Sequence, residues 1–215
     1  MKKHSLLSDI VIFSVIFLLL IVPPFFTTKI PVSSTIFSAW TFPFHQLIFA
    51  LIALLLYFFY YEKKEKKLPF FPLIMTTSLL FCFALFIKFF SVILVTNNVS
   101  EEVNVILPDS VTGWCFCLLN FAFAAFYEEV LYRFYFADQL QELLSYKIKG
   151  KYLWLVCEIL ACLAFAFAHF YLGIFSVINA ILGHVILRLC YKKSGSIWTG
   201  FLAHFIYNVI SLILL

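Results

Sequence analysis

Residues 70–95 of the chain read FFPLIMTTSLLFCFALFIKFFSVILV, and Lys88 is the one charged side chain among them. A helix needs about 20 apolar residues to cross the hydrocarbon core of a bilayer. The stretch is long enough for this, so it predicts a transmembrane helix.

The composition of the whole chain agrees with this fold class. The chain has 215 residues, of which 64% are hydrophobic and 12% are charged, and its mean hydropathy is +1.05. These values exclude a soluble globular domain and make the lipid bilayer the expected surroundings. The formal charge of +4 does not predict a nucleic-acid partner, because the basic residues lie in short clusters between apolar runs.

Further apolar runs flank residues 70–95 on both sides. They are Ile10 to Val22 with its flanks, Trp40 to Tyr61, Trp114 to about Tyr135, Tyr152 to Cys190, and Ile197 to Leu215. The run from Tyr152 is too long for one span, and Gly173, after a turn-like stretch, divides it into two helices. We therefore predict an all-α fold, a polytopic membrane helix bundle of about seven transmembrane helices.

Basic residues predict the orientation of these helices, because Lys and Arg collect in cytoplasmic loops. With seven spans, four basic clusters fall on one side: Lys2 and Lys3, Lys63 to Lys67, Lys147 to Lys151, and Arg188 to Lys193. The other side receives the 97–111 connection, with Glu101, Glu102 and Asp109, and a single basic residue, Lys29. We predict a cytoplasmic N-terminus and an outside C-terminus.

Charged side chains inside the spans are the main functional signal, because each costs about 2.5–3.5 kcal/mol at a helix centre. The fourth helix contains Tyr127-Glu-Glu-Val-Leu-Tyr-Arg133. Glu129 and Arg133 are four residues apart and stack on one face, acid first. Glu128 projects about 100° round the helix and is left without a partner in its own helix. We expect it to act as a general base.

The fifth and seventh helices supply polar partners at the same four-residue spacing. Phe165 and His169 share one helix face, and His204 and Asn208 share another. If the helices bring these residues to Glu128, they form a set that can bind and deprotonate a water molecule and stabilise an oxyanion.

The polar residues also have structural readings. A lone intramembrane histidine is often a packing or helix-linking residue. We predict this role, with an interhelical hydrogen bond, for His184, and an interfacial or loop-facing position for Glu158. We take the six cysteines as small apolar residues.

Together the motifs Glu128-Glu129-x-x-x-Arg133, Phe165-x-x-x-His169 and His204-x-x-x-Asn208 resemble the signatures of the CPBP family of intramembrane proteases. That family unites CAAX prenyl endopeptidases with bacteriocin-processing and immunity-type (Abi) proteins. The resemblance covers residues 112–212. It implies a catalytic core of helices four to seven at 112–215, and three helices without motifs at 1–111, in one continuous membrane domain.

By this resemblance Glu128 activates the water, and His169, His204 and Asn208 hold the water or the oxyanion. Glu129, Arg133 and Phe165 shape the site. A zinc ion, if bound, would take Glu128, His169 and His204 as ligands. Because no His-Glu-x-x-His element is present and Asn208 is a poor zinc ligand, we expect no obligatory metal and no other cofactor.

The depth of the site follows from helix geometry. A fifth helix beginning at Tyr152 places His169 about 26 Å along its axis, whereas His204 lies about 10 Å into its own helix. We expect Tyr152 to Glu158 to protrude into the cytoplasm, so that the site opens toward the cytoplasmic half.

The function we expect is an intramembrane endopeptidase acting on membrane-associated proteins or peptides, in a bacterial cell membrane. A proton-coupled transporter is one alternative, because buried Glu and His residues form proton relays, although no inverted repeat is evident. A non-catalytic membrane protein of the immunity type is another.

Overall fold

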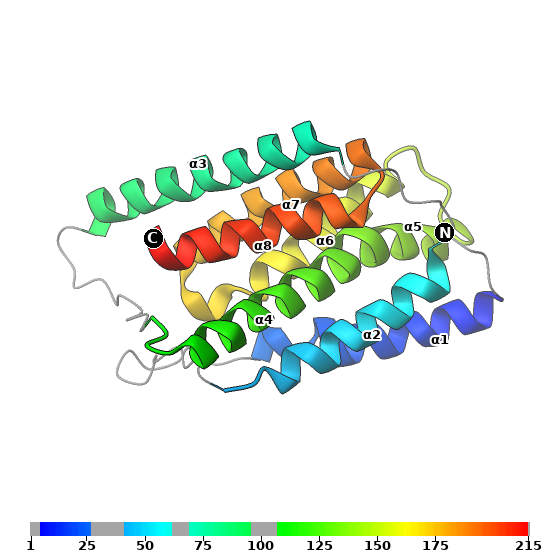
Figure 1. Ribbon diagram of the computed structural model, residues 1–215. Coiled ribbons are helices and arrows are strands. Elements are labelled where there is room, and N and C mark those ends of the chain that lie inside the picture. The colour runs from blue at the N-terminus through cyan, green and yellow to red at the C-terminus, as the bar shows by residue number, and fades with distance from the viewer. Residues whose placement is uncertain (1–4, 27–40, 62–68, 96–106, 215) are drawn as a thin grey trace.

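The computed structural model describes residues 5–26, 41–61, 69–95 and 107–214 (Figure 1). Within these ranges all regular structure is helical and forms seven spans, which confirms the predicted fold class. Some residues used in the predictions lie outside the described ranges: Lys2, Lys3, Lys29, Trp40, Lys63 to Lys67, Glu101 and Glu102.

The first three spans lie close to their predicted positions. They are α1 (Leu6–Ile16) continued by η1 (Phe17–Ile21) and η2 (Pro23–Phe26), then α2 (Phe44–Tyr60) and α3 (Phe70–Val95). The Ser5 side chain caps α1 by accepting a hydrogen bond from the Ser8 backbone N–H at 3.2 Å. Pro23 and Pro24 have no N–H to donate, so the wider turns of η1 end before them and the span continues as the short 3-10 segment η2.

The fourth span is longer and less regular than predicted. It consists of α4 (Val111–Glu128), the π-helical segment η4 (Glu129–Phe136) and α5 (Ala137–Ser145), which form one helix of 35 residues. The predicted end near Tyr135 is wrong, because the polar residues of α5 continue the helix although they end the apolar run. The regular α-helix expected at Glu129–Arg133 is also wrong, since wider π-helical turns occupy this segment.

The last three spans are α6 (Leu153–Phe167), α7 (Ile174–Ser194) and α8 (Ile197–Leu214), with the short turn η5 (Phe170–Leu172) between α6 and α7. Gly173, with φ +98°, separates α6 from α7, as predicted. Gly195, with φ +67°, ends α7 in the left-handed conformation that favours glycine.

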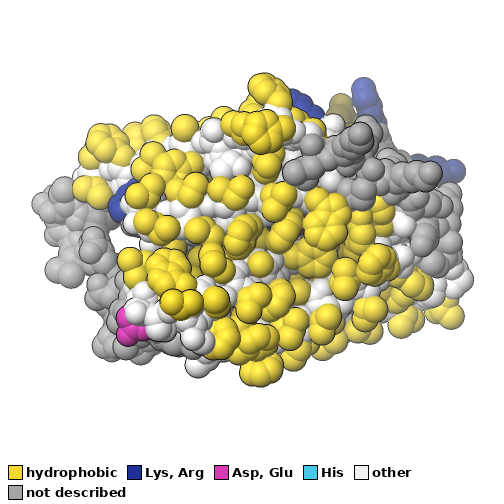
Figure 2. Space-filling view, in the orientation of Figure 1, with side chains coloured by type: hydrophobic (Ala, Val, Ile, Leu, Met, Phe, Trp, Pro, Cys, Tyr) yellow, Lys and Arg dark blue, Asp and Glu magenta, His cyan; other side chains and the backbone are white. Residues whose placement is uncertain are grey.

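The surface is that of an integral membrane protein. Five of the described spans are long and apolar enough to cross a bilayer, and α2 and α6 are shorter apolar helices. Hydrophobic side chains cover most of the face in Figure 2. Large apolar residues are exposed there and elsewhere, such as Phe71 at 76% and Val111 at 82%. Such exposed apolar side chains are suited to contact with lipid, because their exposure to water is unfavourable.

The spans run side by side, with α4, η4 and α5 through the middle of the bundle (Figure 1). α2 packs against α4, α3 packs against α7 and α8, and α6 packs against α5 and α7. The α5–α6 and α7–α8 connections lie at the same end of the bundle (Figure 1). The first of them carries Lys147 to Lys151, and the last turn of α7 beside the second carries Lys192 and Lys193. The side of the membrane that this end faces stays a prediction.

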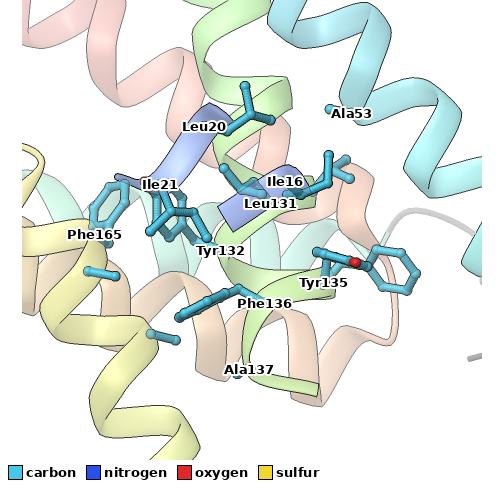
Figure 3. Close-up of a cluster of buried hydrophobic side chains, with 14 of the residues drawn as sticks. Ile16, Leu20, Ile21, Ala53, Leu131, Tyr132, Tyr135, Phe136, Ala137 and Phe165 are labelled. Carbon is cyan, nitrogen blue, oxygen red and sulfur yellow. The ribbon is translucent and has the colours of Figure 1, made fainter. Parts of the chain in front are cut away.

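The segment η4 is enclosed on several sides, and all its residues are buried. Figure 3 shows Leu20 and Ile21 of the first span close to Leu131 and Tyr132 of η4, with Phe165 of α6 nearby. The first two spans, which carry no motif, thus help to hold the motif-bearing helix in place.

Candidate active site

The centre of the site is a buried ion pair on η4. Glu129 Oε1 lies 3.4 Å from Arg133 Nε, and both side chains have 0% exposure. This is the pairing expected from the four-residue spacing. The cost of burying each charge is reduced by the other, so neither can be removed alone without leaving an unpaired charge.

His204 of α8 joins the two glutamates. Its Nδ1 lies 3.0 Å from Glu129 Oε1, and its Nε2 lies 3.8 Å from Glu128 Oε2. The four-residue spacing predicted an ion pair of Glu129 with Arg133 alone. In the structure the same Glu129 oxygen faces both Arg133 and His204, so Glu129 connects the arginine to the histidine.

The contact with Glu129 also determines the tautomer of His204. An ionised carboxylate is only an acceptor, so Nδ1 donates the hydrogen bond to Glu129. In a neutral imidazole this leaves the lone pair on Nε2, the nitrogen that faces Glu128. A water molecule near Glu128 would therefore meet a carboxylate and an imidazole nitrogen together.

Gly200 of α8 makes room for the Glu129 carboxylate. A Cβ placed on Gly200 would lie 2.7 Å from Glu129 Oε2, closer than van der Waals contact allows. Gly200 is one helical turn before His204, so the same face of α8 both admits Glu129 and binds it.

We expect Gly200→Ala to displace the Glu129 carboxylate and to destabilise the protein by about 1–3 kcal/mol, the usual cost of overpacking. Thermal unfolding in detergent measures this effect. Gly183→Ala on α7 is the matched control, because its added Cβ would meet Leu80 Cδ2 at an ordinary 3.7 Å. Equal melting temperatures for the two variants would show that Glu129 does not need the space at Gly200.

The ion pair extends to the second motif through aromatic contacts. The Arg133 guanidinium lies 3.9 Å from the centroid of the Phe165 ring. The Phe165 and His169 rings are 4.6 Å apart, and His169 Nδ1 donates to the Phe165 carbonyl oxygen at 2.8 Å. A chain of contacts thus runs from Glu128 through His204, Glu129, Arg133 and Phe165 to His169.

A cavity of about 690 Å³ adjoins this chain of contacts. The four residues predicted as catalytic all line it: Glu128, His169, His204 and Asn208. No hydrogen bond or ion pair joins His169 or Asn208 to Glu128 within the part of the chain that the structure describes. The fold therefore brings these residues to one space, with Glu128 and His204 in closest approach.

The cavity lies in the half of the bundle where α4 and α7 begin and α8 ends, as its lining residues Asn120, Ser176 and Ser211 show. This half is remote from the lysine-bearing connections (Figure 1). Under the predicted orientation the cavity lies in the outer half of the bundle, so the expected opening toward the cytoplasmic half disagrees with that orientation. The reason is that α5 continues about 25 Å beyond Glu128 at 1.5 Å per residue, which moves Glu128 far from the lysine end.

Two other predictions are corrected by the structure. The loop-facing option for Glu158 is wrong, because Glu158 lies in α6 and accepts hydrogen bonds from Arg188 Nε at 2.9 and 3.1 Å; the interfacial option stays a prediction. His184 is 2% exposed, yet neither ring nitrogen has a hydrogen-bond partner among the described residues. Its ring packs against Phe165, with centroids 5.7 Å apart, so it fills space rather than linking helices by a hydrogen bond.

Sequence reasoning missed other polar residues in the interior. Arg188 was counted as an orientation signal, and Asp9 in the first span was not singled out. Asp9 is 6% exposed and accepts a hydrogen bond from the Tyr60 hydroxyl at 2.8 Å. Asn179 donates to the Tyr207 hydroxyl at 2.8 Å beside the cavity. Each stands within an apolar run, which is the signal that finds such residues.

The donor atoms do not fit a three-ligand zinc site. Among the described residues no three His, Cys, Asp or Glu side chains lie close enough together to hold a metal ion. His204 Nδ1 contacts Glu129 and His169 Nδ1 contacts the Phe165 carbonyl, so Nε2 is the ring nitrogen that each histidine has left for another partner.

Residues 110–210 match the family model described as Type II CAAX prenyl endopeptidase Rce1-like. This part of the chain is an Rce1-like domain. It runs from the Ser110 cap of α4 into α8 and contains all three motifs. No curated protein and no solved structure matches the chain. The match over residues 110–210 agrees with the resemblance read from the motifs, since the CAAX prenyl endopeptidases are one branch of the CPBP family.

Proposed function

We propose that the protein is an intramembrane endopeptidase that hydrolyses peptide bonds with a water molecule activated by Glu128. The observation that carries the proposal is the position of Glu128 Oε2, 3.8 Å from His204 Nε2, at the wall of a cavity inside a membrane bundle. The Rce1-like domain supports it, because its family is one of endopeptidases. A gap of this size is spanned by a shared water molecule more readily than by a direct hydrogen bond.

In the proposed reaction Glu128 takes a proton from the water as its oxygen attacks the carbonyl carbon of the scissile bond. The carbonyl oxygen becomes an oxyanion, which His169 and Asn208 are placed to stabilise from other walls of the cavity. Glu128 then passes the proton to the leaving nitrogen, and the C–N bond breaks. The products are a new carboxyl group and a new amino group, so protons and atoms balance.

The buried residues around the cavity have supporting roles in this proposal. Glu129 holds His204 in one tautomer and orientation through the 3.0 Å contact to Nδ1. Arg133 balances the charge of Glu129, and Phe165 packs between Arg133 and His169. Arg133 and Phe165 also line the cavity, so they help to shape the space that a substrate would enter.

The proposed substrates are membrane-associated proteins or peptides, since the cavity lies among membrane-spanning helices. CAAX prenyl endopeptidase is the description of the family, and we extend it to this chain only as a class of candidate substrate. The proposed location is a bacterial cell membrane, with the C-terminus outside.

Product analysis tests the proposed function. The purified protein in lipid vesicles is incubated with membrane-anchored peptides in water enriched in oxygen-18, and the products are read by mass spectrometry. We expect new C-termini carrying one oxygen-18 atom, formed equally with and without a chelator. Proton uptake into the vesicles without any new C-terminus would overturn the proposal in favour of transport. The absence of both cleavage and proton uptake would overturn it in favour of a non-catalytic binding protein.

A further inference from the structure

Arg188 of α7 is a buried cation that the proposed chemistry does not use. It is 4% exposed. Its Nε and Nη2 donate to the Glu158 carboxylate, with the shortest distance 2.7 Å from Nη2 to Oε1. Nη2 also contacts Asp138, and Nη1 donates to the backbone carbonyl oxygen of Arg133. One side chain therefore meets two carboxylates and a main-chain oxygen.

These contacts join the elements that carry two of the three motifs. The Arg133 carbonyl belongs to η4, and Asp138 lies in α5, which continues the same helix. Glu158 lies in α6, two turns before Phe165 on the same helix face. Arg188 thus joins η4, α5 and α6 to α7.

The carbonyl contact falls on the irregular part of the helix. In a regular α-helix each carbonyl oxygen accepts from the N–H four residues later, whereas π-helical turns change this pairing. A guanidinium that binds a carbonyl of η4 supports the backbone where it departs from α-helical geometry. The side chain of the same Arg133 is paired with Glu129, so a shift of this backbone moves the ion pair and, through it, His204.

Buried ion pairs are weak contributors to stability, because the desolvation cost can match the Coulomb gain. The burial of Arg188 with three acceptors is better explained by a role in fixing the relative positions of the helices that supply those acceptors. We propose that Arg188 is a positioning residue: it holds the π-helical segment η4 in the register that sets Glu129 and His204 against Glu128. This inference rests on the proposed endopeptidase function.

Kinetics of Arg188 variants test the inference. We expect Arg188→Met to lower kcat by about 10²-fold, the effect of displacing a catalytic group by about 1 Å, and to leave KM within about twofold. Arg188→Lys should recover part of the rate, because an ammonium can reach some of the three acceptors. Lys192→Met is the matched control, since Lys192 also binds Glu158 but is half-exposed and has no hydrogen bond or ion pair with η4 among the described residues. Equal kcat for the Arg188→Met and Lys192→Met variants would overturn the inference.

Amide hydrogen exchange tests the same inference without any substrate. We expect Arg188→Met to speed exchange at residues 129–138 by about tenfold or more, while Lys192→Met leaves it unchanged. Acceleration spread evenly over α3, α7 and α8 would show a general loss of stability and overturn the positioning role, as would no change at 129–138. If the wild-type protein cleaves nothing, the proposed function fails, and the exchange result still decides whether Arg188 holds η4.

Discussion

Glu128→Gln is expected to lower the rate of peptide cleavage by about 10²–10⁴-fold, the range that general acid–base catalysis contributes. Glutamine has nearly the same shape as glutamate but cannot take a proton from water. Its amide would still fill the space beside His204 Nε2. The loss is therefore expected in kcat, with substrate binding retained. Steady-state kinetics on a substrate that the wild-type protein cleaves measure it.

The protein itself should tolerate this change. The Glu128 side chain is 14% exposed and faces the cavity, so its replacement removes no buried ion pair. We expect a melting temperature close to that of the wild type. Glu142→Gln, on the α5 end of the same helix, is the control and should keep full activity. Undiminished cleavage by the Glu128→Gln variant would exclude Glu128 as the base.

Glu129→Gln is expected to impair both stability and cleavage. The change leaves the Arg133 guanidinium buried without a counter-charge, which costs about 3–5 kcal/mol when one partner of a buried pair is removed. It also removes the carboxylate that holds the Nδ1 proton of His204. Loss of tautomer control in a comparable carboxylate–histidine pair lowers kcat by about 10⁴-fold. Thermal unfolding and kinetics measure the two effects.

A double variant separates the two roles of Glu129. In Glu129→Gln with Arg133→Met both charges are gone, so we expect most of the lost stability to return. Cleavage should stay low, because His204 still lacks its carboxylate partner. Recovery of both stability and cleavage would mean that Glu129 serves only to neutralise Arg133, and that the 3.0 Å contact to His204 has no part in the chemistry.

The spans and the motif residues could be read from the sequence because both depend on local properties. A run such as residues 70–95 must be helical in lipid, where each backbone polar group needs an internal partner. Glu129 and Arg133 meet because they are one turn apart on one helix. Gly173 divides two helices because its positive φ suits few other residues.

Other features escaped the sequence because they depend on which helices are neighbours. α5 was missed because its residues are amphipathic rather than apolar. Glu158 and Arg188 come from different helices, so neither local sequence predicts their contact. The π-helical segment η4 was missed too; it is buried among other helices, and its carbonyl at Arg133 is bound by Arg188 from α7.

The sequence by itself determined that this is a membrane bundle of helices with three polar motifs, because the cost of polar groups in lipid marks each motif as a site. Only the tertiary structure decided how the glutamates divide their roles. The spacing within one helix pairs Glu129 with Arg133, but the approach of α8 gives the same carboxylate to His204 and turns Nε2 toward Glu128. That approach depends on Gly200, whose missing side chain lets two helices pack closely enough for the contact.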